Sequence, residues 1–344
     1  MNPYSIEGRK QRWRDFLSMN NVTRFVYHIN YQPDNKPRPW PWPDNKDQRI
    51  EWSWERYQRH LDRTQWLNDD SIPYLDVYTG TEIFAEAFGC EIYRPEDNMP
   101  FALPMIHNAR EVAGLKVPDL SVQPFAMLFE IADELRKRAG KDAIMRLVDI
   151  QSPMDIAALI WDKNDLYIAM IETPEAVKEL SGKVTEFMIN FLDEWFNRYN
   201  REFIAHYPVY YMPEGITLSE DEVGIINDEM FLEFFMPELK ELSYRYGGIG
   251  VHCCADARHQ WDNFSRIPEL RLLNLVQPVN ELKEAYNFFA HRVPQMHSWF
   301  GEGPAWTWPG QYPGNARVVM EVGASSKDEA LNLADKLHKS CGRN

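Results

Sequence analysis

The segment IGVHCCADARHQWDNFSRIPELRLLNLV, residues 249–276, contains one complete strand–helix–strand unit. IGVHCC predicts a strand, HQWDNFSRI is typical of a short helix, and LRLLNLV predicts a second strand. Strands that alternate with helices in this way indicate a parallel sheet with helices packed on it. This unit therefore sets the expectation for the rest of the chain.

The same alternation extends in both directions from this unit. Further strands are predicted at residues 72–80, 90–93, 143–150, 207–214, 295–300 and 316–324. Helices are predicted at residues 1–20, 51–68, 81–88, 125–139, 152–162, 174–199, 227–247, 280–290 and 325–340, with Pro237 as a kink or boundary. The sheet could be open or closed, but the length and the absence of a glycine-rich dinucleotide motif favour a closed (β/α)8 TIM barrel.

Residues 32–47, QPDNKPRPWPWPDNKD, contain too many prolines for a helix or a central strand and are expected to form a loop or an arm. We therefore predict that residues 1–70 are a helical and Pro/Trp-rich extension packing on the barrel. The barrel itself is expected to span residues 71–344.

Composition narrows the classes of partner. The 344 residues carry a net charge of −15, which opposes binding to nucleic acid or to an anionic membrane surface. No apolar run reaches membrane-spanning length, and the N-terminal sequence has no apolar core of a signal peptide. Four cysteines are too few for a disulfide framework. We expect a soluble, cytoplasmic protein that acts on a small molecule.

Aromatic residues are abundant, with 12 Trp, 16 Tyr and 18 Phe. Their rings could line a pocket for a flat or cationic ligand, or they could pack long loops onto the barrel. Both interpretations remain open at this stage.

Polar residues at the ends of the predicted strands are the candidates for chemistry, because the active sites of such barrels lie at the carboxyl ends of the strands. The candidates are Asp76, Asp149, His252, Cys254, Gln277, Asn280, His297, Trp299 and Glu321. Among them, Asp149, Gln277, His297 and Trp299 are predicted to contact substrate, and Asp76 and Glu321 to act in catalysis.

His252 and Cys254 are separated by one residue of an extended segment, so their side chains point to the same side and could both bind one zinc ion. Cys253 then faces the helices. The alternative is that these are small buried residues at a strand end. A catalytic zinc needs a third protein ligand, and Cys341, His297 and Asp149 are possible; Glu321 is preferred because it lies in or just beyond the last strand.

The acidic run SEDE, residues 219–222, has two interpretations. It could contact substrate at a loop tip, or it could be a solvated helix N-terminus stabilised by the helix dipole.

Several segments together resemble the uroporphyrinogen decarboxylase superfamily, which includes corrinoid-dependent methyltransferases. They are AEAFGCEIYRPEDNMPFALPMI, TPEAVKELSGKVTEFMINFL, SEDEVGIINDEMFLEFFMPELKEL, GGIGVHCCAD and VVMEVGASSKDEALNLADKL. The resemblance extends from about Ile72 to the C-terminus and implies a (β/α)8 barrel.

The methyltransferase branch fits better than the true decarboxylases. Nothing matches the arginine-containing FMRQAGRY motif, and Gly323-Ala324-Ser325 stands where decarboxylases have a GHG-like turn. The methyltransferases hold zinc with an H-x-C motif, which matches His252 and Cys254, and with a distant cysteine, which has no match near residues 324–326. The resemblance thus implies a Zn²⁺ site and a corrinoid (cobalamin) cofactor, carried by a partner protein.

Three functions follow as hypotheses. The first is a methyltransferase that moves a methyl group between a small substrate or thiol and a corrinoid at a zinc site. The second is a metal-free decarboxylase or lyase acting on a small or tetrapyrrole carboxylate, with Asp76 or Glu321 transferring the proton. The third is a barrel that binds a small molecule without catalysis.

Overall fold

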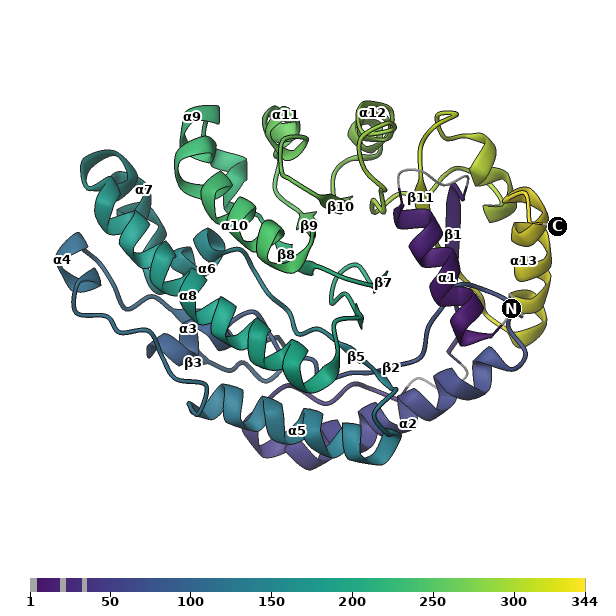
Figure 1. The fold of residues 1–344 in the computed structure, drawn as a ribbon, viewed down its shortest axis with the longest axis horizontal. Helices are drawn as coiled ribbons and strands as arrows, with labels where there is room; N and C mark the ends of the chain where they lie inside the picture. The colour runs from purple at the N-terminus through teal and green to yellow at the C-terminus, as the bar shows by residue number, and fades with distance from the viewer. Residues whose placement is uncertain (1–4, 19–22, 33–35, 344) are drawn as a thin grey trace.

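A computed structural model describes residues 5–18, 23–32 and 36–343 (Figure 1). The helices form an outer layer around the strands, and both ends of the chain lie on the side of the molecule occupied by α1 and α13. The helices are α1 Ile6–Leu17, α2 Lys46–Thr64, α3 Ile83–Phe88, α4 Ala109–Val112, α5 Gln123–Ala139, α6 Pro153–Ile160, α7 Lys163–Glu172, α8 Pro174–Tyr199, α9 Asp228–Met230, α10 Met236–Tyr246, α11 Trp261–Phe264, α12 Val279–Phe288 and α13 Lys327–Ser340. The strands are β1 Phe25–Asn30, β2 Tyr74–Leu75, β3 Glu91–Tyr93, β4 Phe101–Leu103, β5 Ile144–Arg146, β6 Phe203–Ile204, β7 Tyr211–Met212, β8 Ile216–Ser219, β9 Ile249–Cys253, β10 Leu270–Leu275 and β11 Val318–Gly323.

The inner strands follow one another as parallel neighbours, and the fold is a (β/α)8 TIM barrel. β1 pairs with β11, β9 pairs with β8 on one side and with β10 on the other, and β2 pairs with β5. Single bridges at Gln295 connect β10 to β11, and a bridge from Gln151 to Ser219 connects the end of the β5 segment to β8. The predicted barrel is thereby confirmed, although the strand expected at residues 295–300 is reduced to this bridging position.

Two other predicted strands have a different role from the one expected. The segment 90–93 contributes β3, which pairs antiparallel with β4 as a hairpin. The segment 207–214 contributes β7, which pairs antiparallel with β6, and its neighbour β8 supplies the barrel strand. Alternating apolar residues predicted extended chain correctly, but they do not specify the pairing partner.

Sequence analysis missed the short strands β4, β6 and β8, and it also missed β1, FVYHIN. It lies within residues 1–70, and it is a fully paired neighbour of β11, with His28 opposite Glu321. The pairing with β11 places β1 in the barrel sheet. The division into an extension, residues 1–70, and a barrel, residues 71–344, otherwise stays a prediction. The ends of the predicted helix 1–20 and the centre of the Pro-rich loop, residues 33–35, lie outside the described residues.

The seam between β1 and β2 is closed by carboxylates. In the described part of the chain no strand pairing joins these two strands, and the Asp70 N–H donates instead to the Tyr27 carbonyl at 2.9 Å. Asp70 Oδ2 accepts the Tyr27 N–H at 2.8 Å, and Asp69 Oδ2 accepts the Ile29 N–H at 2.9 Å. Two side chains thus satisfy the backbone donors that a neighbouring strand would otherwise satisfy.

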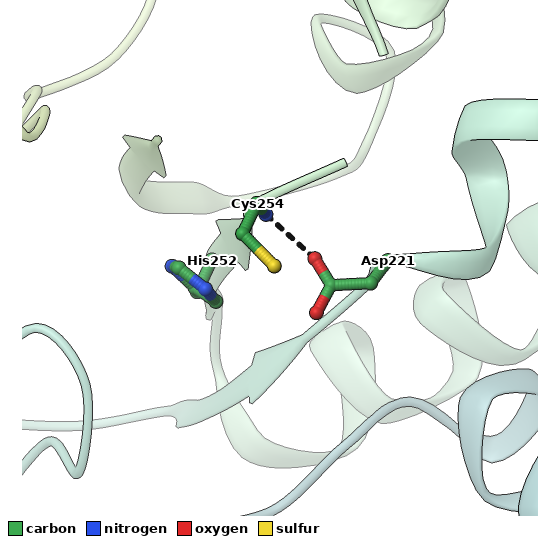
Figure 2. Close-up of side chains that lie close together, drawn as sticks. All are labelled: Asp221, His252 and Cys254. Carbon is green, nitrogen blue, oxygen red and sulfur yellow. Dashed lines mark hydrogen bonds between the residues drawn. The ribbon is translucent and has the colours of Figure 1, made fainter. Parts of the chain in front are cut away.

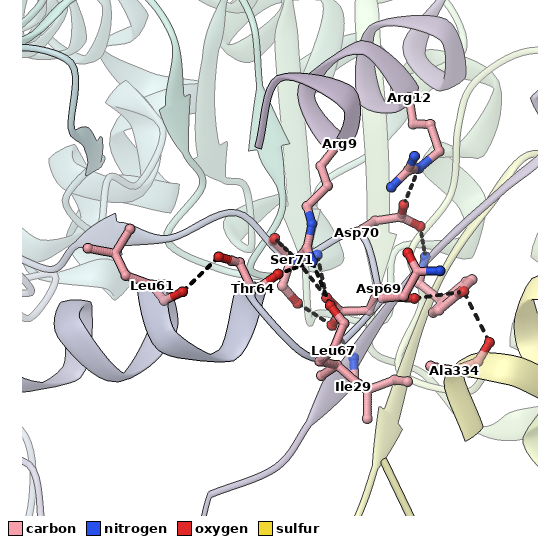
Figure 3. Close-up of polar contacts among 12 residues, drawn as sticks. Arg9, Arg12, Ile29, Leu61, Thr64, Leu67, Asp69, Asp70, Ser71 and Ala334 are labelled. Atoms are coloured by element: carbon pink, nitrogen blue, oxygen red, sulfur yellow. Dashed lines mark hydrogen bonds and ion pairs between the residues drawn. The ribbon is translucent and has the colours of Figure 1, made fainter. Parts of the chain in front are cut away.

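Arginines from both ends of the chain pair with these two buried carboxylates, and Figure 3 shows those of α1, Arg9 and Arg12. Arg9 of α1 donates to Asp69 at 3.1 Å, and Arg12 donates to Asp70 at 2.7 Å. Arg343, beyond α13, reaches Asp70 at 2.6 Å. Burial alone would raise the pKa of Asp70, but the Arg343 and Arg12 guanidiniums outweigh it and hold that pKa below its ordinary value. The seam therefore fixes α1 and the C-terminal residues against the same edge of the barrel.

Packing between the outer helices depends on aromatic rings. Phe125 of α5 lies 4.9 Å from Phe187 and 5.2 Å from Phe191, both on α8. Phe84 of α3 contacts the same three rings in edge-to-face geometry. Such pairs contribute about 0.5–1.5 kcal/mol each beyond their buried area. For these residues, packing is the role that the structure gives to the abundant aromatics.

No helix among the described residues is both long and apolar enough to cross a membrane.

Candidate functional site

Three possible metal ligands converge where β8 and β9 end. In this parallel pair Ser219 lies opposite His252, so the residues that follow β8 meet the end of β9. The Asp221 carboxylate, a His252 ring nitrogen and the Cys254 thiol all lie within 4.8 Å of one another (Figure 2). We refer to these three residues as the triad.

The orientation of the His252 ring is set by its neighbour on β10. Asn274 lies opposite His252 in the register, and its amide Nδ2 donates to the Met296 carbonyl. That bond leaves Asn274 Oδ1 to accept from His252 Nδ1–H, at 2.5 Å. The proton of a neutral His252 is therefore assigned to Nδ1, and the Nε2 lone pair remains available for a metal.

Tyr207 covers the other side of this ring. Its own ring packs edge-on against His252 with centroids 4.8 Å apart. Burial raises the pKa of the Tyr207 hydroxyl, and the nearby carboxylate of Glu321 and thiol of Cys254 raise it further. Tyr207 is thus within electrostatic range of both the triad and the last strand.

Asp221 is held in place by a buried carboxyl below it. Asp155 of α6 accepts the backbone N–H of Asp221 at 2.8 Å and that of Glu222 at 2.9 Å. Asp221 in turn accepts the Cys254 N–H through Oδ1 at 2.6 Å. The two strand ends are consequently joined by side chain to backbone bonds that fix the position of the Asp221 carboxylate.

Asp155 forms a buried acidic pair with Glu220, which is fully buried and accepts from Ser152 Oγ at 3.1 Å. Burial, followed by the negative charge of Asp221, raises the pKa of Asp155 to about 7. Burial and then the neighbouring Asp155 raise the pKa of Glu220 well above its ordinary value. Both shifts favour the protonated form of these carboxyls.

The two adjacent cysteines differ in environment, as strand alternation requires. Cys253 is fully buried, and Cys254 is exposed. Burial, followed by the negative charge of Asp221, raises the pKa of Cys254 to about 12, so the thiol is the favoured form. A metal ion binds the thiolate, so metal binding here would release the proton.

The triad is chemically suited to zinc. It offers one nitrogen, one sulfur and one oxygen donor from three protein ligands, which is the number that catalytic zinc sites use while a fourth position stays open to substrate. The His252–Asn274 bond supplies the outer hydrogen bond that orients a ligating histidine.

Glu321, the third ligand preferred from the sequence, does not join this group. Among the described residues the gathered donors are Asp221, His252 and Cys254. Glu321 accepts a hydrogen bond from Asn30 Nδ2 and lines a cavity beside β1. Asp221 is the third donor of this group, because β8 adjoins β9 directly whereas β11 is separated from β9 by β10 and Gln295. Metal binding by Glu321 stays a prediction. Its catalytic role stays a prediction.

The structure separates the remaining predicted residues from the triad in different ways. His297 is fully buried, its Nδ1 accepts the Leu275 N–H at 3.1 Å, and its Nε2 lies 2.9 Å from Gln295 Oε1. Both ring nitrogens are therefore occupied within the barrel wall. Gln277 donates to the Ala255 carbonyl and braces the loop after β9. Substrate contact by His297 and Gln277 stays a prediction.

Trp299 packs 6.2 Å from the Tyr286 ring, with the Lys283 ammonium 5.1 Å from its own ring centroid. This arrangement is typical of a residue that packs a loop onto the barrel. A role for Trp299 in substrate binding stays a prediction.

Asp76 and Asp149 follow β2 and β5 and have opposite electrostatic environments. Asp76 is paired with Arg146 at 2.8 Å and Arg56 at 3.3 Å, which outweigh the effect of burial and lower its pKa. Burial raises the pKa of Asp149 to about 6, and its Oδ2 lies 3.4 Å from His206 Nε2. Their roles in catalysis and substrate binding stay predictions.

Asp221 and Asp155 were missed as site residues. Asp221 belongs to the acidic run SEDE, residues 219–222. The two interpretations of that run were a substrate contact and a solvated helix N-terminus, and neither is metal binding. Asp155 had a weak signal, because Ser152 begins α6 as its N-cap and Asp155 stands three residues later. Nothing in the sequence indicated that this carboxyl would turn toward the end of β8.

These observations define a (β/α)8 barrel with a candidate metal centre at the carboxyl ends of its strands. The family model described as uroporphyrinogen decarboxylase (URO-D) matches residues 74–276, more than half of the chain. The chain belongs to this family. Among solved structures, a methyltransferase from Methanosarcina mazei is similar in fold, with a TM-score of 0.64 and 12% identity over 97% of this chain and 98% of that chain. The search of curated proteins gave no match.

Proposed function

We propose that the chain is a zinc-dependent methyltransferase that moves a methyl group between a small substrate or thiol and a corrinoid carried by a partner protein. The observation that carries this proposal is the triad, in which nitrogen, sulfur and oxygen donors meet at the carboxyl ends of two adjacent barrel strands. The fold shared with the Methanosarcina mazei methyltransferase supports the same class of reaction.

His252, Cys254 and Asp221 are the residues proposed to hold the metal. When bound, zinc supplies a Lewis acid that lowers the pKa of a thiol or hydroxyl and makes it nucleophilic at neutral pH. Asn274 keeps the His252 lone pair directed at the metal position. Asp155 keeps Asp221 in reach of that position through the backbone.

Residues around the triad have supporting roles in the proposal. Tyr207 covers the His252 ring and limits the access of water to it. Gln277 holds the loop that follows Cys254 through the Ala255 carbonyl. Substrate enters from the side where Cys254 is exposed.

Metal analysis of the purified chain tests the ligand set. We expect about one zinc per chain in the wild type and loss of zinc in His252→Ala and Cys254→Ser, because two remaining ligands hold zinc weakly. Cys253→Ala is the matched control, since this buried thiol lies next to the triad but outside it. Glu321→Gln should keep its zinc, whereas loss of zinc in this variant would restore Glu321 as the third ligand.

A methyl-transfer assay tests the reaction. The zinc-loaded wild type, mixed with methylcobalamin and a panel of small thiols, should form methylated thiol together with the demethylated corrinoid. Cys254→Ser should lose this activity and Cys253→Ala should keep it. A protein that binds zinc stoichiometrically but transfers no methyl group to any thiol, and from no methyl donor to the corrinoid, would contradict the proposal.

A further inference from the structure

A second feature of the barrel is a cavity at the seam between β1 and β2. Its volume is about 600 Å³, within the range typical of pockets for small organic molecules. It extends from Asn30, at the end of β1, inward to Tyr210, and α2 forms one wall. None of the triad residues lines it.

Aromatic rings form much of the cavity surface. They are Trp13, Tyr31, Trp52, Trp66, Tyr74, Tyr210 and Tyr211. The Tyr210 side chain reaches the interior because Gly250 of β9 has no side chain, and a Cβ there would collide with the Tyr210 hydroxyl. These rings therefore offer a surface on which a flat apolar molecule can stack.

One face of α2 directs three arginines toward the same cavity. Arg56, Arg59 and Arg63 are spaced by three and four residues, which places them on one side of the helix. Arg56 is engaged by Asp76 at 3.3 Å and by the Tyr74 hydroxyl, and Arg59 lies 3.7 Å from Glu55. Within the part of the chain that the structure describes, the Arg63 side chain has no hydrogen bond or ion pair.

The balance of charge in the cavity differs from that of the whole chain. Lys36 and the three arginines face two acidic residues, Asp62, which is exposed, and Glu321, which accepts from Asn30. The chain as a whole carries a net charge of −15. Glu55 pairs with Lys36 and with Arg59, and Asp76 pairs with Arg56. Among the described residues that line the cavity, Arg63 is therefore the cation left to attract an anion.

The positive charge of the three arginines affects the pKa of His60. It packs edge-on against Tyr74 at 5.4 Å, and its Nδ1 is buried without a hydrogen-bond partner. Burial, and then the charges of Arg56, Arg63 and Arg59, lower the pKa of His60 well below its ordinary value. The ring is neutral at pH 7, so His60 adds no positive charge to the cavity.

We propose that this cavity binds an organic anion with a flat, apolar body, which stacks on the aromatic rings while its carboxylate pairs with Arg63. A guanidinium without an internal partner is suited to this contact because its planar N–H groups match a carboxylate. The site is separate from the triad, so the proposal does not depend on metal binding or on methyl transfer.

Titration of the full chain with 2-naphthoate and with its neutral analogue 2-naphthamide tests the proposal. Calorimetry gives the affinities, and quenching of tryptophan fluorescence reports entry beside Trp52 and Trp66. We expect naphthoate to bind about ten-fold or more tightly than naphthamide, because the two share a body and differ in charge. Equal affinities, or no binding of either compound at millimolar concentration, would overturn the proposal.

Variants locate the contact. Arg63→Gln should weaken naphthoate binding about ten-fold and leave naphthamide binding unchanged. Arg258→Gln is the matched control, since Arg258 is an exposed arginine paired with Glu284 and does not line the cavity. Circular dichroism checks that both variants fold. Unchanged naphthoate affinity in folded Arg63→Gln would overturn the assignment.

A metal-site variant separates this proposal from the proposed function. Cys254→Ser should bind naphthoate as the wild type does, whether or not the wild type contains zinc. Loss of naphthoate binding in Cys254→Ser would place the anion at the triad and overturn the cavity assignment.

Discussion

Two buried acidic pairs stand at different places in the barrel, and they differ in the groups that surround them. Asp69 and Asp70 close the seam between β1 and β2, and Asp155 and Glu220 lie beneath the triad. All four side chains are essentially removed from solvent. The first pair is surrounded by arginines, whereas the second has backbone N–H groups and Ser152 Oγ as its donors.

The comparison shows that the partners of a buried carboxyl decide its charge. Arg343 and Arg12 hold the pKa of Asp70 below its ordinary value, despite burial. Without a cation, burial and neighbouring acidic groups raise the pKa of Asp155 to about 7 and raise that of Glu220 well above its ordinary value. The seam consequently depends on ion pairs, while the support beneath the triad depends on hydrogen bonds.

Asp70→Asn should give the largest effect. The variant keeps the shape of the side chain but leaves Arg12 and Arg343 without their buried anion. Removing one partner of a buried ion pair lowers the free energy of unfolding by about 3–5 kcal/mol. Urea unfolding measures this loss, with Asp97→Asn, an exposed aspartate, as the control. A loss below about 1 kcal/mol, the range of exposed ion pairs, would show that the seam does not depend on this charge.

Acid should remove the same contribution more gradually. Because the folded pKa of Asp70 lies below its unfolded value of about 4, its contribution is fully present above that value and is lost as pH falls toward the folded pKa. The difference in unfolding free energy between wild type and Asp70→Asn should therefore be constant from pH 7 to about pH 5 and shrink below about pH 4. A difference that grows on acidification would contradict the lowered pKa.

Glu220→Gln should give the smallest effect, although Glu220 is as buried as Asp70. Because the raised pKa of Glu220 favours its protonated form, a glutamine replaces this carboxyl by a neutral amide that still offers a donor to Asp155. We expect a loss of less than about 1 kcal/mol at pH 7, measured by urea unfolding with a chelator present. A loss as large as that of Asp70→Asn would show that Glu220 is ionised and that the two pairs do not differ.

The sequence predicted the fold and the candidate site to different extents. The alternation of apolar strands and amphipathic helices predicted the barrel, because periodicity is a local property of the chain. β1 was missed because FVYHIN is a short segment between a predicted helix and the Pro-rich loop. Its role becomes visible only through its pairing with β11, almost 300 residues away.

For the site, the sequence by itself determined that His252 and Cys254 share one side of a strand and that Cys253 faces away, since alternation follows from strand geometry. Only the tertiary structure decided that Asp221 is the third donor gathered there, that Asp155 holds it, and that the α2 arginines share a cavity with aromatic rings from several elements. The physical reason is that these meetings depend on which strands become neighbours and in what register. Strand order and register are set by the packing of the whole barrel, which no local pattern encodes.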